Sequence, residues 1–222
     1  TLHPAFQDRI DSTALAAFLR LLYVPTPLSI YQGIGKLPPG SLLRVRPGDL
    51  RASGLPVPTA YWDAAETAAA AMRNPLRCEE EELVLELESL LSDSVGLRML
   101  ADVPLGAFLS GGVDSSSVVA LMQTQSTRSV KTFSIGSGHG EYDEAAKARA
   151  VAKHLGTEHT ELIVGPSQAL SILPKIPGYY DEPFADLSQV PTCLVSQLAR
   201  QHVTVALSGD GGDEMFGGYH FY

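Results

Sequence analysis

Two loops of this 222-residue chain carry residue types and spacings that could perform chemistry. The first, residues 110–116, reads Ser-Gly-Gly-Val-Asp-Ser-Ser and follows the apolar run 105–109. The second, residues 208–214, reads Ser-Gly-Asp-Gly-Gly-Asp-Glu and follows the apolar run 203–207. Glycines let a backbone approach a ligand closely, and the free N–H groups of a helix start attract anions. The first loop therefore predicts an anion cradle between a strand and a helix.

Each loop also contains a central carboxylate, Asp114 in the first and Asp213 in the second. In open α/β sheets the ligand lies beyond the carboxyl ends of the strands, so both loops would overhang one crevice if their strands are neighbours. Two carboxylates beside bound phosphates are ligands that Mg²⁺ prefers. The structural alternatives are a helix cap for the first loop and a flexible surface turn for the second.

The elements that must position these loops alternate along the second part of the chain. The acidic residues 79–82 indicate the start of a helix. This helix has an apolar stripe at Leu83, Leu87, Leu90, Leu91 and Val95. The pattern predicts strands at 105–109, 130–135, 159–164 and 203–207, and further helices at 115–125, 143–155, 167–173 and 188–201. Short apolar strands that alternate with helices predict an α/β fold with a parallel, doubly wound sheet.

The first part of the chain differs in character. Residues 1–45 form a small unit, in which Asp11 or Ser12 can cap a helix with apolar Leu15, Phe18, Leu19 and Leu22. Residues 46–75 resemble a linker because of their Pro, Gly and Ala content. We expect three parts, 1–45, 46–75 and 76–222. Neither end resembles a natural terminus, so we expect a piece of a longer protein.

Composition excludes several classes of partner. The net charge is -9 without a Lys/Arg cluster, which disfavours nucleic acid and anionic membranes. No apolar stretch reaches transmembrane length, and no secretion signal is recognisable. Cys78 and Cys193 lack metal-ligand spacing, and so few cysteines favour the cytoplasm.

Common catalytic motifs are absent. The chain has no G-x-x-x-x-G-K-[ST] loop and no G-x-G-x-x-G after a strand, and Phe108 stands where a G-x-S-x-G elbow needs glycine. Without a placed base, Ser110 is a poor nucleophile. Its hydroxyl is instead predicted to donate a hydrogen bond to the bound anion. His139, His154 and His159 show no ligand spacing.

The first loop resembles the pyrophosphate loop of N-type ATP pyrophosphatases, which GMP synthetase and NAD synthetase share. The flanking segments narrow the resemblance to glutamine-dependent asparagine synthetase, a class II amidotransferase, because they follow that family's order. These segments are 102–109, 131–135, 141–144, 181–184 and 207–219, and segments 19–25 and 29–40 resemble the end of the family's glutaminase domain. The resemblance implies that 1–45 is the tail of the glutaminase domain and 76–222 the first part of the synthetase domain.

The resemblance also implies ligands and roles. ATP and Mg²⁺ would bind, aspartate would be adenylated and then amidated by ammonia from glutamine, and Asp114 and Asp213 would hold the metal. Adenosine would contact Leu109, Ile135, Ser208 and Gly209, and the pyrophosphate would lie on Ser110, Gly111, Gly112, Ser115 and Ser116. Asp210 and Glu214 would face the aspartate or the adenylate.

The chain departs from the family pattern at both ends. The family's glutaminase nucleophile is an N-terminal Cys, whereas this chain begins with Thr1, which is not expected to be a nucleophile. The family's lysine near the phosphates would come after Tyr222. We therefore expect a glutaminase domain in cis in the longer protein, and no glutamine hydrolysis or asparagine synthesis by this chain alone. A homodimer is a separate expectation for the assembly. Alternatives are a relative that closes a β-lactam ring or amidates another carboxylate, and a non-catalytic nucleotide-binding remnant.

Overall fold

The computed structural model describes residues 6–49, 56–137 and 144–219. The chain folds as two compact units. One unit holds the residues up to Arg77 together with Pro177–Asp186, and the other holds Cys78–Ile176 and the residues from Leu187 onward. Among the described residues, no helix combines the length and the apolar character needed to cross a bilayer.

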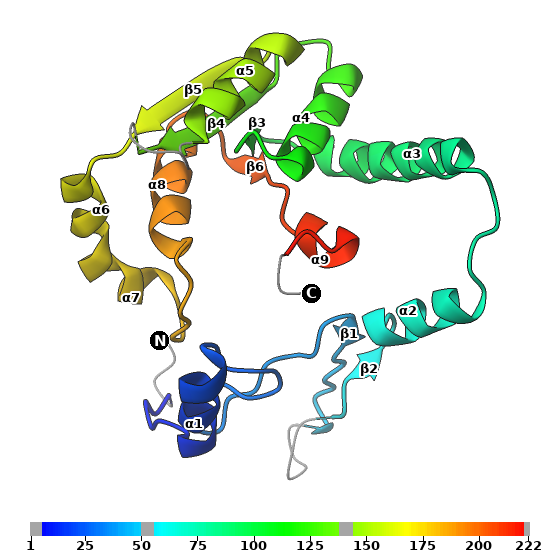
Figure 1. Ribbon diagram of the computed structural model, residues 1–222. Coiled ribbons are helices and arrows are strands. Elements are labelled where there is room, and N and C mark those ends of the chain that lie inside the picture. Colours follow the sequence, from blue (N-terminus) through cyan, green and yellow to red (C-terminus); the bar gives the residue numbers. More distant parts are fainter. Residues whose placement is uncertain (1–5, 50–55, 138–143, 220–222) are drawn as a thin grey trace. The chain divides into compact units, whose positions relative to one another are not determined.

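The second unit is built on a four-stranded parallel sheet (Figure 1). Its strands are β3 (Leu105–Phe108), β4 (Lys131–Gly136), β5 (Glu158–Ile163) and β6 (Val205–Leu207), in the order β5-β4-β3-β6. Ala107 of the central strand β3 pairs with Thr132 on one side and Leu207 on the other. The chain moves outward from β3 through β4 to β5 and then returns to the opposite side of β3. The two loop-bearing strands are therefore neighbours, which meets the condition for a common crevice, and the switch point lies between β3 and β6.

Helices cover both faces of this sheet, which confirms the doubly wound α/β class. Helices α3 (Glu80–Met99), α4 (Val113–Gln125) and α5 (Ala145–Leu155) pack on one face, and α8 (Gln189–Ala199) packs on the other. Neighbouring residues of β3 point to opposite faces, so Ala107 joins the first core and Phe108 borders the second. This unit also contains α6 (Pro166–Ile172), the 3₁₀ turn η2 (Leu173–Lys175) and α9 (Gly212–Phe216), whereas most of α7 (Ile176–Tyr179) belongs to the first unit.

Two predicted helices differ in detail from the observed ones. Of the predicted apolar stripe on α3, only Val95 is buried, whereas Leu90 is 63% exposed and Leu87 40% exposed. The first turns of α3 therefore lie outside the packed core, although the helix itself forms as predicted. The predicted start of α5 at Asp143 lies outside the described residues, and the helix is observed from Ala145.

A histidine is held by hydroxyl groups between β4 and β5. The Thr132 Oγ1 lies 2.9 Å from Nδ1 of His159, and the Ser134 Oγ lies 3.1 Å from its Nε2. Burial lowers the pKa of His159 below its ordinary 6.5, the Glu161 carboxylate acts against that shift, and the Arg149 guanidinium lowers the pKa further. His159 is thus a structural histidine with both ring nitrogens in hydrogen-bonding contact.

This lowered pKa predicts acid sensitivity of folding. Because the unfolded chain binds a proton at His159 more readily than the folded chain, the free energy of unfolding should fall as the pH drops below about 6.5. Above that pH the histidine is neutral in both states and contributes no pH dependence. Urea titrations of His159→Gln between pH 5 and 8 should give a flatter pH profile than the wild-type chain. The exposed His154→Gln is the control, and an equal flattening there would contradict the assignment to His159.

The first unit begins with the predicted helix, α1 (Ser12–Leu21). Asp11 caps it, because its carboxylate accepts from the Thr13 N–H at 2.8 Å and the Ala14 N–H at 3.0 Å. The stretch 46–75, interpreted from sequence as a linker, contains β2 (Thr59–Ala60), which pairs with β1 (Ser41–Leu42), and α2 (Ala64–Arg73). Four consecutive alanines and a capping hydrogen bond from the Glu66 N–H to Asp63 favour this second helix.

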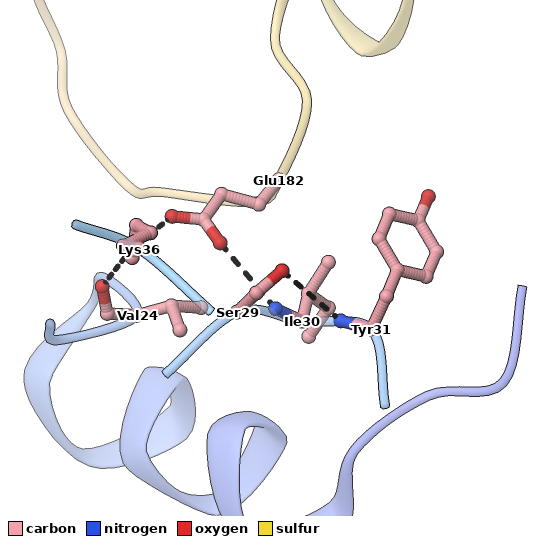
Figure 2. A network of polar contacts seen from close by, with 6 residues as sticks. All are labelled: Val24, Ser29, Ile30, Tyr31, Lys36 and Glu182. Atoms are coloured by element: carbon pink, nitrogen blue, oxygen red, sulfur yellow. Dashed lines mark hydrogen bonds and ion pairs between the residues drawn. The ribbon is translucent and has the colours of Figure 1, made fainter. Parts of the chain in front are cut away.

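A segment from far along the sequence completes the first unit (Figure 2). The Glu182 carboxylate pairs with the Lys36 ammonium, which also donates to the Val24 carbonyl. The second oxygen of Glu182 accepts from the Ile30 N–H at 3.4 Å. Lys36 and Glu182 are both half-buried, so each charge is only partly solvated by water. The ion pair offsets this loss of solvation. Periodicity along the chain gave no indication of this contact across 146 residues.

Candidate functional site

The two chemistry-bearing loops touch at the carboxyl ends of β3 and β6. A Cβ placed on Gly209 would lie only 2.8 Å from the backbone nitrogen of Ser115. A Cβ placed on Gly212 would lie 2.4 Å from the Cγ of Asp114, so the Asp114 carboxylate rests directly on the second loop. Residues about a hundred positions apart thus form one site, as the neighbouring strands require.

The first loop is closed by its own hydroxyl groups. The Ser110 and Ser115 Oγ atoms lie 2.8 Å apart, the Gly112 N–H donates to the Ser110 Oγ at 3.2 Å, and the Ser110 N–H donates to the Ser115 Oγ at 3.2 Å. Ser115 is buried, at 8% exposure. Its hydroxyl therefore helps to close the loop, and its predicted contact with a ligand stays a prediction. Helix α4 starts within this loop at Val113, with Gly112 as its N-cap and Asp114 in its first turn.

The same loop is fixed from behind by α5. Gly111 has a φ of 82°, and a Cβ there would lie 2.5 Å from the Ala148 nitrogen and 2.7 Å from the Lys147 Cβ. Only glycine combines this left-handed conformation with so close an approach of a helix backbone. The loop is therefore held between the starts of α4 and α5.

The second loop forms a short turn of its own. Its Ser208 hydroxyl donates to the Asp210 carboxylate at 2.9 Å, and Gly211 has a φ of 95° before α9 begins. The Glu214 carboxylate accepts from the Tyr219 hydroxyl at 2.8 Å, and this hydrogen bond lowers the pKa of Glu214. Glu214 thus stays ionised to lower pH than an ordinary glutamate.

A cavity of about 740 Å³ opens between α3, α4, the second loop and α9. Four of the predicted site residues line it, Asp114, Ser208, Gly209 and Asp210. The sequence analysis assigned no ligand contact to its other walls, which include Arg98 from α3 and Met215 and Phe216 from α9. Met215 and Phe216 lie within the segment 207–219 that carries the family resemblance. Arg98 follows no recognisable motif, and the packing of α3 against α4 brings it to the site.

The other predicted site residues lie outside the lining of this cavity. Leu109 is 1% exposed in the core, so only its backbone remains for a ligand, and Ile135 is the last residue but one of β4. The Asp213 side chain leans on Gly218, because a Cβ on that glycine would lie 1.9 Å from an Asp213 carboxylate oxygen. The further residues outside the lining are Ser110, Gly111, Gly112, Ser115, Ser116 and Glu214.

The carboxylates near the cavity suit a cation that is shared with a ligand. Among the described residues, no three His, Cys, Asp or Glu side chains gather into a metal site. Asp114 and the residue before Asp213 are nevertheless in contact. Proteins usually bind Mg²⁺ through one or two carboxylates, and phosphate oxygens of the ligand complete the coordination shell. The donors present therefore fit Mg²⁺ that arrives with a nucleotide.

The fold and the two loops define an α/β protein with a ligand crevice at the switch point of a parallel sheet. Residues 86–222 match the family model described as asparagine synthase. The chain belongs to the asparagine synthase family.

Curated relatives agree with this assignment. The chain is 37% identical to the glutamine-hydrolysing asparagine synthetase 1 of Bacillus subtilis, over 96% of this chain and 32% of that protein. It is 33% identical to asparagine synthetase B of Escherichia coli, over 62% of this chain and 27% of that protein. Amidase chry2 of Gibberella zeae is 28% identical over 86% of this chain and 30% of its own length. The chain thus spans about a third of the length of these relatives.

Proposed function

We propose that this chain is the nucleotide-binding part of a glutamine-hydrolysing asparagine synthetase, an ATP-dependent carbon–nitrogen ligase. The observation that carries the proposal is the direct contact of the loops 110–116 and 208–214 at the β3/β6 switch point, in a chain of the asparagine synthase family. In this proposal residues 76–222 are the first part of the synthetase domain and 1–45 the tail of the glutaminase domain, which lies in cis in the longer protein.

The proposed reaction has two steps. The side-chain carboxylate of aspartate attacks the α-phosphorus of ATP, which forms β-aspartyl-AMP and releases pyrophosphate. Ammonia from glutamine then attacks the activated carbonyl and displaces AMP, which yields asparagine. Negative charge grows on the departing pyrophosphate in the first step. Donors placed where this charge develops lower the barrier more than donors that bind ATP uniformly.

Each part of the site has a role in this proposal. The backbone of 110–112 and the start of α4 receive the pyrophosphate, and the strand ends at Leu109, Ile135, Ser208 and Gly209 face the adenosine. Asp114 and Asp213 would hold Mg²⁺, which when bound neutralises the phosphate oxygens. Asp210, exposed at the cavity rim, and Glu214 are assigned to the aspartate side.

The cavity supports part of this division of roles. Ser208 and Gly209 line it together with Asp114 and Arg98, whereas Leu109 and Ile135 lie outside its lining. The structure closes Ser115 into the loop, so in this proposal its hydroxyl shapes the cradle and its backbone N–H faces the phosphate.

The test is pyrophosphate release from ATP by the longer protein that carries this chain, supplied with ammonium and a panel of carboxylic acids. We expect AMP and pyrophosphate in equal amounts, with aspartate as the best carboxylate. Release of ADP and phosphate would refute the adenylation chemistry. Preference for another carboxylate would favour the alternative of a related amidating or β-lactam-forming enzyme, and absence of MgATP binding would favour a non-catalytic remnant.

A further inference from the structure

We propose that Lys147 binds the terminal phosphates of the nucleotide held by the loop 110–116, in addition to any lysine further along the longer protein. This inference rests on the proposed function. It concerns a residue that no recognisable motif marks, at the start of α5 and directly behind the cradle.

Contact with Gly111 carries the argument. The Lys147 Cβ lies 2.7 Å from where a Cβ on Gly111 would be, so the base of the lysine side chain touches the loop at Gly111. The Cα–Cβ bonds of a helix tilt toward its N-terminus. The N-terminus of α5 follows β4, so it lies at the carboxyl edge of the parallel sheet, where both loops also lie. In this proposal the long, flexible lysine stem reaches from Gly111 to that edge.

The two loops carry an excess of negative charge, which a cationic side chain beside them would offset. The two loops contain four carboxylates, Asp114, Asp210, Asp213 and Glu214, and no Lys or Arg. ATP brings several further negative charges, and like charges at this distance repel. Lys147 is exposed, and it forms no ion pair in the described part of the chain. Its ammonium group is thus available to an incoming phosphate.

Lys153 provides a matched control on the same helix. It lies in the last turn of α5, at the opposite end of the helix from Lys147.

Calorimetry on the longer protein that carries this chain tests the proposal with three probes, MgATP, magnesium pyrophosphate and AMP. Lys147→Gln should weaken MgATP and pyrophosphate about tenfold, as expected for a charge-assisted phosphate contact, and should leave AMP unchanged. Lys147→Arg should retain most of the affinity, and Lys153→Gln should match the wild type for all three probes. Thermal melting checks that each variant is folded.

The outcomes separate this inference from the proposed function. If the wild-type chain binds both ATP and pyrophosphate and Lys147→Gln changes neither affinity, the lysine assignment is overturned and the proposed function stands. If the chain binds pyrophosphate but not ATP, and the variant loses it, the assignment stands and the proposed function fails. Equal losses for all three probes, AMP included, would overturn the assignment in favour of a structural role. Failure of the wild type to bind either phosphate probe overturns both.

Discussion

Gly111→Ala is expected to lower the free energy of unfolding by about 2–4 kcal/mol and to abolish ATP binding. An L-residue at a φ of 82° costs about 1 kcal/mol or slightly more. The added methyl group would also lie 2.5–2.7 Å from the backbone of α5 at Lys147 and Ala148, and such overpacking costs about 1–3 kcal/mol. Helix backbone cannot rotate away as a side chain can, so the loop must move and lose its cradle shape.

Gly156→Ala is the matched control for this prediction. Gly156 ends α5 with a φ of 71°, and a Cβ there would meet nothing within 4 Å. Its replacement should therefore cost only the conformational part, about 1 kcal/mol, and leave ATP binding intact. Urea unfolding and calorimetry with MgATP on both variants measure the difference. Equal losses of stability in Gly111→Ala and Gly156→Ala would show that a side chain at position 111 does not clash with α5.

The fold of the second unit was predictable because its signals are local. Strands buried on both faces give continuous apolar runs, and the helices between them are long enough to be recognised. The pairing of β3 with β6 could be anticipated only from the matching Leu-Ser-Gly sequences at 109–111 and 207–209. Two strands that end in the same sequence are thus candidates for neighbours in the sheet when one ligand must contact both following loops.

Other features depend on contacts that no periodicity records. Three such features arise from tertiary packing: the Lys36–Glu182 ion pair, the hydrogen bond between the Ser110 and Ser115 hydroxyl groups, and the close approach of α5 to Gly111. A serine in a loop sequence looks the same whether its hydroxyl meets a ligand or its own backbone. The sequence therefore located the candidate loops, and the packing decides which of their groups remain available.

Asp114 should show opposite effects on ATP binding with and without magnesium. Asp114→Asn keeps the size of the side chain that rests on Gly212 and removes its charge. If Asp114 holds Mg²⁺, the substitution should weaken MgATP about a hundredfold, a loss typical of an unpaired charge in a polar site. Metal-free ATP should bind more tightly than to the wild type, because one repulsive carboxylate has gone. Calorimetry with and without EDTA measures both affinities.

Two further variants separate charge from position at this site. Gly212→Ala adds a methyl group 2.4 Å from the Asp114 Cγ, so it displaces the carboxylate without removing it. We expect weaker MgATP binding here too, but no gain for metal-free ATP, since the negative charge remains. Asp93→Asn removes an exposed carboxylate from α3, away from the cavity lining, and should change neither affinity. Unchanged MgATP affinity in Asp114→Asn would remove Asp114 from the metal site and leave its contact with Gly212 as a purely structural link between the loops.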